Sequence, residues 1–433
     1  MPLKLFDSLS QTTKYLPKKQ LITIYVCGPT LYNYLHLGNL RPIVIFDFLI
    51  RYLKYKNLDY KYIQNLTDID EKIFISAKEK GLTSSELTSQ YTNSFFHIYR
   101  KLNLIQPDLL PRVSEHISEI KWVINSLIAR DQAYWDKPSQ TIKFLQPTKD
   151  KSLNYFTSYE DQVSEEANFA LWKENINSSE DYESPWFRGI PGWHVECFAM
   201  LNKYFELPIT IHGGGVDLKF PHHENVNLLS RSACNCEIAE IWIHIGQVLN
   251  EAGKLSKSSN FSWKVEDCAK NYSWDLLRYI FLKAKYNKPQ TITKTNLDNY
   301  WSEWKSFISA LNYSRIILER ERINEEFNEI HIKQLDQQII DSLENDLNLP
   351  EILSLLEVWK QSLLNAIKLN HIQDMIFYRK KLSFHLNWLG FAVPKLNSEE
   401  LNLARDWFDL VDSKDYQKAD LIRAQLQEKI IIP

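Results

Sequence analysis

The sequence predicts an α/β protein in which a parallel sheet forms the core, an insertion interrupts that core, and an all-α region follows it. Two observations support this prediction. A strand, a helix and a second strand follow one another near the N-terminus, and a unit of this kind implies parallel strands. From about residue 298 the apolar pattern is helical to the end. We expect a core at 1–245 with an insertion at about 100–190, a connecting region at 246–297, and a helical region at 298–433.

The strand–helix–strand unit begins with a β-branched run at 21–27, which ends at Gly28 and Pro29. A short apolar run bounded by Gly and Pro is typical of a buried strand. Apolar residues then recur at helical spacing across 39–55, which predicts a helix. A second strand is expected at 60–66.

The middle of the chain divides into a helical part and an irregular part. Residues 85–135 carry a helical pattern with a break between Pro107 and Pro111. Residues 136–190 are rich in Ser, Asn, Glu and Asp, which favours an irregular insertion.

Two further strands are expected to complete the core. The first, at 207–212, runs into three consecutive glycines, and the second, at 238–248, precedes a polar loop at 250–260. The C-terminal helices are expected to break near 348–350 and 393–394, because each contains a proline.

Composition excludes several classes of protein. The chain has 51 Lys and Arg against 54 Asp and Glu, so any RNA contact must come from local patches. No apolar run reaches the ~18 residues of a membrane span, and the N-terminal residues lack the apolar centre of a secretory signal. A cytoplasmic location is therefore expected. Five cysteines, an odd number, favour metal binding or burial over a disulfide framework.

The segment 29–39 lies between the end of a strand and the start of a helix, and it contains His36 and Gly38. A helix N-terminus offers N–H groups and the positive end of a dipole, which suits a triphosphate. His36 could donate to phosphate oxygens, and Gly38 lets the chain approach a nucleotide closely. A lone His-x-Gly is more often a turn with a hydrogen-bonded histidine.

A second polar segment, 254–260, contains Lys254 and Lys257 with serines around them. Two lysines in a loop can form a mobile clamp that stabilises charge on a transferring phosphoryl or nucleotidyl group. Taken alone, such a fragment is more often a solvated loop.

Together the two segments resemble the signatures of class I aminoacyl-tRNA synthetases. Residues 36–39, His-Leu-Gly-Asn, are similar to His-Ile-Gly-His, and residues 254–258, Lys-Leu-Ser-Lys-Ser, are similar to Lys-Met-Ser-Lys-Ser. Their order and separation also agree with that family. The resemblance implies a Rossmann-type catalytic core in which His36, Lys254 and Lys257 are catalytic. It further implies ATP contacts at Pro29, Thr30, His36, Gly38, Asn39 and Lys257.

A group of cysteine and histidine residues narrows the substrate. Cys27 ends the first strand, Cys197 lies in a Gly-Trp-His-Val-Glu-Cys segment, and His222 lies in Phe-Pro-His-His-Glu. Thiolates and imidazoles are preferred zinc ligands, and a catalytic zinc keeps an open position that a cysteine thiolate could fill. Singly, each cysteine is more often a small core residue. Together the three residues resemble the zinc site of cysteinyl-tRNA synthetases, which implies one zinc per chain.

The resemblance to cysteinyl-tRNA synthetases covers nearly the whole chain, through segments at 25–30, 41–42, 65–70, 111–117, 169–173, 183–186, 191–194 and 212–218. It implies an enzyme that activates L-cysteine with ATP and Mg²⁺ and transfers it to tRNA(Cys). It also implies a monomer without an obligate protein partner. Substrate contacts are implied for Cys27, Gly28, Thr67, Trp193 and Asp217.

Two features depart from the pattern of that family. The family's last zinc ligand is a Glu four residues after the metal-binding His, and that position is Val226 here. Water or the substrate thiolate would then take the fourth place. The family's C-terminal Pro-Gln-Gly-Thr-x-Trp-Arg segment is missing. In the helical region, tRNA phosphates are expected to contact Arg315, Arg320, Arg322 and the run 379–381.

Two alternatives remain open. The chain could be a paralogue that activates cysteine or another amino acid for an acceptor other than tRNA, although the helical C-terminal region argues against this. It could also be an inactive RNA-binding relative. The presence of His36, Lys254 and Lys257 argues against that second alternative, whereas Val226 favours it.

Overall fold

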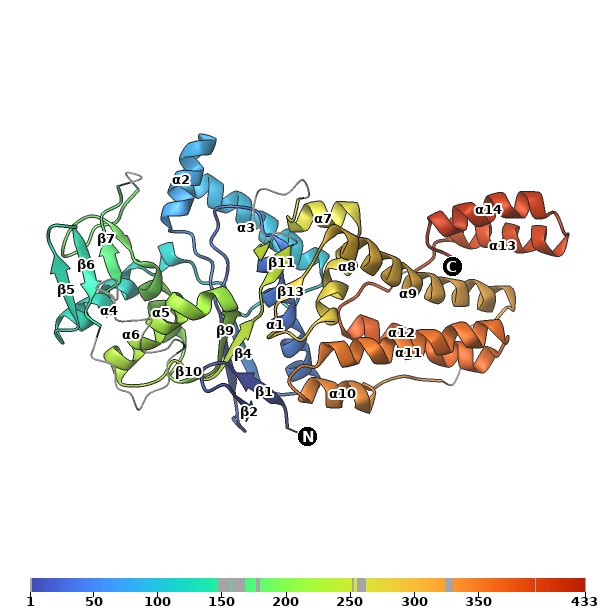
Figure 1. The fold of residues 1–433 in the computed structure, drawn as a ribbon, viewed down its shortest axis with the longest axis horizontal. Coiled ribbons are helices and arrows are strands. Elements are labelled where there is room, and N and C mark those ends of the chain that lie inside the picture. The colour runs from blue at the N-terminus through green and yellow to red at the C-terminus, as the bar shows by residue number, and fades with distance from the viewer. Residues whose placement is uncertain are drawn as a thin grey trace.

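The centre of the molecule is a four-stranded parallel sheet (Figure 1). The computed structural model describes residues 2–146, 156, 168–176, 180–250, 253–254, 262–323, 330–393 and 395–432, with only the backbone of 253 and 254. The strands lie in the order β10 (Ala239–Ile245), β9 (Ile209–Gly215), β3 (Ile22–Val26) and β4 (Tyr60–Gln64). The predicted α/β fold with a parallel sheet is confirmed.

Both faces of this sheet are buried. Helix α1 (Leu37–Tyr55) joins β3 to β4, and its apolar side chains pack with Ile22, Ile24 and Val26 of β3. Side chains alternate along a strand, so Tyr25 and Cys27 face a second core on the other side. Helices α4 (Ile117–Ile128), α5 (Trp193–Tyr204) and α6 (Glu224–Cys234) supply that second core. Burial on both faces explains the largely apolar run of β3.

The described residues between β4 and β9 form the helices α2 to α5 and a second sheet. Helices α2 (Glu71–Lys80) and α3 (Ser84–Lys101) come first. After α4, four short antiparallel strands follow, namely β5 (Ala133–Asp136), β6 (Thr141–Phe144), β7 (Ala170–Lys173) and β8 (Ile190–Pro191). The expectation of irregular structure at 136–190 is therefore wrong for β6, β7 and β8, and the helical pattern expected up to residue 135 is wrong for β5. Runs of two to four residues carry too little alternation to be recognised in the sequence.

The connecting region leaves the core through a kink at Gly246. The single strand expected at 238–248 is two strands, because β10 ends at Ile245 and β11 (Val248–Asn250) joins another sheet. That sheet also contains β12 (Gly253–Lys254) and β13 (Gln290–Thr291). A Cβ at Gly246 would lie 2.1 Å from the carbonyl oxygen of Lys288, so only glycine fits. Helices α7 (Val265–Asn271) and α8 (Trp274–Tyr279) follow.

The C-terminal region is helical, as predicted. It consists of α9 (Lys294–Arg320), α10 (Gln337–Glu344), α11 (Leu349–Lys368), α12 (Ile372–Trp388), α13 (Ser398–Asp412) and α14 (Tyr416–Glu428). The helices end at the expected breaks, and Pro350 stands in the first turn of α11, where proline is tolerated. In Figure 1, α13 and α14 form a hairpin set apart from the other helices. Among the described residues, no helix is long and apolar enough to cross a membrane.

A short hairpin of β1 (Lys4–Asp7) and β2 (Thr12–Tyr15), which the sequence did not predict, packs beside β10. Asp7 accepts a hydrogen bond from the backbone N–H of Trp242 at 2.8 Å, and Ser8 donates to the carbonyl oxygen of the same residue at 3.0 Å. The hairpin therefore places Ser8 beside Trp242 of β10.

Candidate active site

The topology places a binding site at the carboxyl ends of β3 and β9. β4 and β9 lie on opposite sides of β3, so the strand order reverses direction at β3. In open parallel sheets, ligands bind outside the carboxyl ends of the strands at such a point. Cys27 directly follows β3, and its N–H donates to the carbonyl oxygen of Gly213 at 3.0 Å.

A strip of predicted substrate and ATP residues lies along this edge. Thr67 and Thr30 form a β-bridge, and the N–H of Thr67 donates to the carbonyl oxygen of Pro29 at 3.3 Å. The N–H of Gly28 donates to Oδ1 of Asn65 at 2.9 Å. A Cβ at Gly28 would lie 1.8 Å from the carbonyl oxygen of Asn65. The chain passes so close here that only glycine fits.

His36 caps the N-terminus of α1. Its Nδ1 accepts a hydrogen bond from the backbone N–H of Asn39 at 3.3 Å, and Oδ1 of Asn39 accepts from the N–H of His36 at 3.3 Å. This is a capping box in which histidine takes the place of the usual Ser or Thr. Gly38 lies in the first turn of the same helix. The four residues 36–39 therefore present a helix N-terminus, which suits a phosphate group.

The segment after the lysine loop returns to this helix start. His36 forms a β-bridge with Lys264, and the N–H of Leu37 donates to the carbonyl oxygen of Trp263 at 3.1 Å. Lys254 ends β12, which is paired with β11. Its side chain, like Lys257 as a whole, lies outside the described residues.

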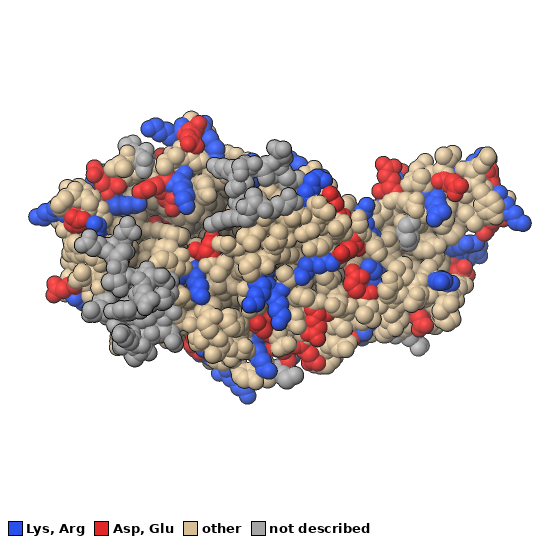
Figure 2. Space-filling view, in the orientation of Figure 1, with Lys and Arg blue, Asp and Glu red and all other residues tan. Residues whose placement is uncertain are grey.

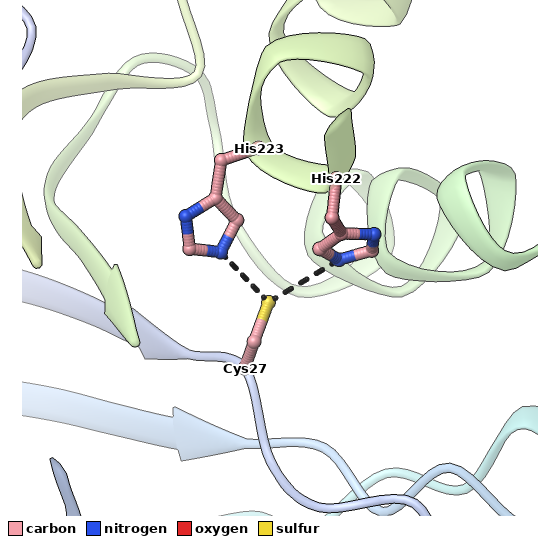
Figure 3. Close-up of side chains that lie close together, drawn as sticks. All are labelled: Cys27, His222 and His223. Atoms are coloured by element: carbon pink, nitrogen blue, oxygen red, sulfur yellow. Dashed lines mark hydrogen bonds between the residues drawn. The ribbon is translucent and has the colours of Figure 1, made fainter. Parts of the chain in front are cut away.

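Cys27 faces two imidazoles at the start of α6 (Figure 3). Its Sγ lies 3.6 Å from Nε2 of His222 and 3.3 Å from Nε2 of His223. In the described part of the chain, these three residues form the one His, Cys, Asp or Glu group whose ligand atoms all lie within 4.8 Å of one another. The positive end of the α6 dipole also favours negative charge on a thiolate here.

Of the predicted ligand set, Cys27 and His222 belong to this group, whereas Cys197 lies near Cys27 but outside the group. Sγ of Cys197, from α5, lies 3.9 Å from Sγ of Cys27. In a tetrahedral zinc site with Zn–S near 2.3 Å and Zn–N near 2.05 Å, two sulfurs lie about 3.8 Å apart and a sulfur and a nitrogen about 3.6 Å apart. The distances from Cys27 to Cys197 and His222 therefore fit zinc. Val226 is fully buried among apolar side chains.

Each of the two imidazoles is held by a further histidine. Nδ1 of His222 lies 3.1 Å from Nδ1 of His194, and the ring of Trp193 stacks on His222 with centroids 4.4 Å apart. Nδ1 of His223 lies 2.7 Å from Nε2 of His244. His244 in turn contacts Oγ of Ser8 through its Nδ1. Histidines that bind metals commonly have their second nitrogen held in this way.

Burial keeps these histidines neutral. It lowers the pKa of His194 and of His244 to about 3, and it lowers the pKa of His222 and His223 well below 6.5, with neighbouring histidines adding to the effect. Neutral imidazole is the form that binds a metal. The pKa of the Cys197 thiol is raised by its hydrogen bond with Cys27 and by burial, an effect that a bound cation would oppose.

The remaining predicted substrate residues lie around this group. Trp193 begins α5 and is 38% exposed, with one face against His222. Asp217 is exposed and follows the three glycines that end at Gly215. A Cβ at Gly214 would lie 3.7 Å from Cβ of Cys27 and 3.4 Å from the His223 ring, so the glycine run lets β9 pass close behind the site.

The contacts of Ser8, His194 and His244 with this group were not predicted from the sequence. A signal was present, because five of the eleven histidines fall between residues 194 and 244. The hydrogen-bonded pairs among them could not be inferred, since Ser8 and His244 are 236 residues apart. His212 is buried, and neither of its ring nitrogens has a hydrogen-bond partner among the described residues.

Comparison with known proteins agrees with this geometry. Residues 13–302 match the family model described as the tRNA synthetases class I (C) catalytic domain. The chain belongs to this family. The cysteine--tRNA ligase of Mesoplasma florum is 33% identical over 99% of this chain and 100% of its own length. The cysteine--tRNA ligase 1 of Tropheryma whipplei strain Twist is 36% identical over 82% of this chain and 78% of its own length.

Among solved structures, members of the wider class I synthetase group share the fold. A Mycobacterium tuberculosis methionyl-tRNA synthetase in complex with methionyl-adenylate superposes with a TM-score of 0.60. It covers 86% of this chain at 12% identity, and 90% of that chain is covered in turn. The class I synthetase fold of the parallel-sheet core predicted from the sequence is confirmed by this similarity.

Several basic residues expected to contact tRNA are held by partners within the chain. Arg320 donates to both carboxylate oxygens of Asp412, at 2.9 and 2.8 Å. Lys381 pairs with Asp336 at 2.6 Å and lies over the ring of Trp359. These two side chains therefore stabilise the helical region. Figure 2 shows basic and acidic side chains interspersed over the visible face, without a large area of one sign.

Proposed function

We propose that the chain is an ATP-dependent cysteine--tRNA ligase. The observation that carries this proposal is the position of Cys27 and His222, 3.6 Å apart, beside the turn that leads to the capped N-terminus of α1. A thiol-selective centre and a phosphate-binding helix start thus share one edge of the sheet. The named relatives, similar over the full chain, support the same activity.

The reaction has two steps. The carboxylate of cysteine attacks the α-phosphate of ATP, which forms cysteinyl adenylate and releases pyrophosphate. A hydroxyl of the 3′-terminal ribose of tRNA(Cys) then attacks the adenylate carbonyl and releases AMP. The start of α1, with His36, holds the phosphates of ATP, and Lys254 and Lys257 bring positive charge to the leaving pyrophosphate. Mg²⁺ would accompany ATP.

Selection of cysteine is assigned to the group around Cys27. Serine differs from cysteine by one atom, and a pocket distinguishes such small changes by only ~1–3 kcal/mol. Cys27, Cys197 and His222 would hold zinc, which would supply a Lewis acid that prefers a thiolate to a neutral hydroxyl. The indole of Trp193, 38% exposed, would cover the substrate side of His222.

Amino-acid-dependent ATP–pyrophosphate exchange, run with all twenty amino acids, tests this proposal. Exchange is expected with cysteine and not with serine, and the same enzyme should then charge tRNA(Cys). Exchange with cysteine but no charging would favour the paralogue with another acceptor. RNA binding without exchange for any amino acid would favour the inactive relative and overturn the proposal.

A further inference from the structure

His223, like His222, directs a ring nitrogen at the sulfur of Cys27. Its Nε2 lies 3.3 Å from Sγ of Cys27, and the ligand atoms of Cys27, His222 and His223 all lie within 4.8 Å of one another. Figure 3 shows the two imidazoles converging on the sulfur from opposite sides. A sulfur–nitrogen edge of about 3.6 Å in a zinc tetrahedron differs from the distance to His223 by only about 0.3 Å.

The tautomer of His223 follows from a chain of hydrogen bonds. Ser8 donates its one hydroxyl hydrogen to the carbonyl oxygen of Trp242, which can only accept. With that hydrogen so placed, the oxygen of Ser8 accepts from Nδ1–H of His244. Nε2 of neutral His244 then carries no hydrogen and accepts from Nδ1–H of His223 at 2.7 Å. The Nε2 of His223 is left with a lone pair directed at the group around Cys27.

The ring of His222 is also held by a second histidine. Its Nδ1 lies 3.1 Å from Nδ1 of His194, which leaves its Nε2 for the group around Cys27. Two imidazoles thus present the same nitrogen to one sulfur, and in each the other ring nitrogen faces a further histidine. Orientation of the second nitrogen is the usual arrangement behind metal-bound histidine.

The neighbouring position on the helix offers no ligand. Val226 lies one helical turn after His222 and is fully buried among apolar side chains. Glu224 accepts from the backbone N–H of Phe156 at 2.6 Å through Oε2. His223 is therefore the side chain of this segment, besides His222, whose ligand atom meets Cys27 in the described structure.

We propose that His223 is itself a metal ligand, which binds zinc through Nε2 together with Cys27 and His222, and that His244 and Ser8 position its ring. This inference rests on the metal site of the proposed function and adds a nitrogen ligand to it. The site would then hold zinc through the thiolate of Cys27 and two imidazoles, which leaves a position for the substrate thiolate, while Cys197 lies 3.9 Å from Cys27 but outside this group of three.

Metal binding by the full-length protein tests the inference without reference to activity. Zinc affinity is measured by competition with a chelator, and the ligand field is read from the visible spectrum of the cobalt-loaded protein. His223→Gln should lower zinc affinity by more than about 100-fold and change the cobalt spectrum. His244→Phe, which removes the nitrogen that accepts from His223 but keeps an aromatic ring, should cost ~10–100-fold, the range typical of such partners.

A matched control is His212→Gln, because His212 is equally buried and packs edge-on against His223 with ring centroids 4.6 Å apart, but directs no nitrogen at Cys27 in any hydrogen bond. It should leave affinity and spectrum unchanged. An unchanged cobalt spectrum in a folded His223→Gln protein would overturn the inference.

A second measurement needs no variant and so does not depend on folding of a mutant. The wild-type protein, labelled with ¹⁵N in its histidines and loaded with ¹¹³Cd, should show cadmium coupling at Nε2 of two histidines. Coupling at one histidine alone would overturn the assignment of His223 and leave the proposed enzyme intact. Absence of any bound metal, with cysteine-dependent exchange retained, would overturn the metal site and this inference but not the activity.

Discussion

His36 combines a structural role and a chemical role that two substitutions can separate. Its Nδ1 caps α1 by accepting from the N–H of Asn39, and the helix start that it caps is the proposed phosphate site. Asn is a strong N-cap residue, whereas Ala is a poor one. His36→Asn should therefore keep the stability of α1 but lose the imidazole, and His36→Ala should lose both.

We expect both variants to slow cysteinyl adenylate formation by ~100–1,000-fold, the effect of removing one preorganised donor. Only His36→Ala should also lower the free energy of unfolding, by ~1 kcal/mol. Single-turnover adenylate formation and urea unfolding measure the two effects. A His36→Asn enzyme that forms adenylate at the wild-type rate would show that His36 serves only the helix.

At the scale of single residues, the sequence predicted the members of the site better than their connections. Cys27 and His222 lie together as expected, and His36 stands at the predicted helix start. The series of hydrogen bonds from His223 through His244 to Ser8 could not be predicted, because it depends on the packing of the β1–β2 hairpin against β10. Tertiary contacts of this kind leave no periodic pattern.

Among the elements, the sequence predicted long helices and missed short strands. Helix α1 begins at Leu37, two residues before the expected 39, because the cap at His36 lies outside the apolar pattern. Strands β5 to β8 have two to four residues each and were not recognised. These strands are stabilised by side-chain pairs with neighbouring strands, and such pairs cannot be recognised from the sequence of one strand.

A buried ion pair joins α1 to α8, and its loss should be costly. Nη1 of Arg278 in α8 lies 2.6 Å from Asp47 in α1, with side chains 0% and 2% exposed. Arg278 also donates to the carbonyl oxygens of Leu102 and Leu389, at 2.6 and 3.0 Å. Asp47 pairs in addition with Arg51 at 2.8 Å. Removing the carboxylate would leave two guanidinium groups without their counter-charge.

We expect Asp47→Asn to lower the free energy of unfolding by ~3–5 kcal/mol, as found when one partner of a buried pair is removed. The control is Arg188→Met, since Arg188 is 58% exposed in its pair with Asp181 and exposed pairs contribute at most ~1 kcal/mol. Urea unfolding at neutral pH measures both. Equal losses in the two variants would contradict the structural role given to the buried pair.

His385 gives the helical region a pH dependence. It is buried in α12, its Nδ1–H donates to the carbonyl oxygen of Lys381 at 2.7 Å, and its Nε2 accepts from the N–H of Asp336 at 2.9 Å. Burial lowers its pKa below 6.5. The unfolded chain therefore binds a proton that the folded chain excludes, so this contribution to stability is present above pH ~6.5 and is lost as pH falls below it.

His385→Gln should remove this contribution, because Gln can accept from Asp336 and donate to Lys381 but does not titrate. Between pH 7.5 and 5.5 the wild-type protein should lose up to ~1.4 kcal/mol per pH unit more than the variant. The control is His371→Gln, since His371 is 61% exposed. Identical pH slopes for wild type and His385→Gln in urea unfolding would rule the effect out.

Across the whole molecule, the hydrophobic core does not follow the boundary expected at residue 298. One buried cluster includes Leu49 of the sheet-covering helix α1 together with Trp304 of α9 and Leu382 of α12. The sequence could not predict this continuity, because a change from mixed to helical pattern reports local structure rather than packing. Cutting the chain near residue 300 would expose that shared core, so the catalytic part would not fold alone.

The hairpin of α13 and α14 is a better place to divide the molecule. Its core is a separate small cluster, to which α9 contributes Ile316. Deleting residues 395–433 would expose Ile316 fully, worth ~1.5–3 kcal/mol, and uncover the partly buried Tyr313 and Ile317 of the same helix. The rest should therefore remain folded, and ATP–pyrophosphate exchange with cysteine should continue near the wild-type rate. Charging of tRNA(Cys) should fall if the hairpin contacts the tRNA, and salt dependence of charging should weaken as phosphate contacts are lost. A deleted protein that exchanges and charges as the full chain does would place the tRNA contacts of the helical region on α9 to α12 alone.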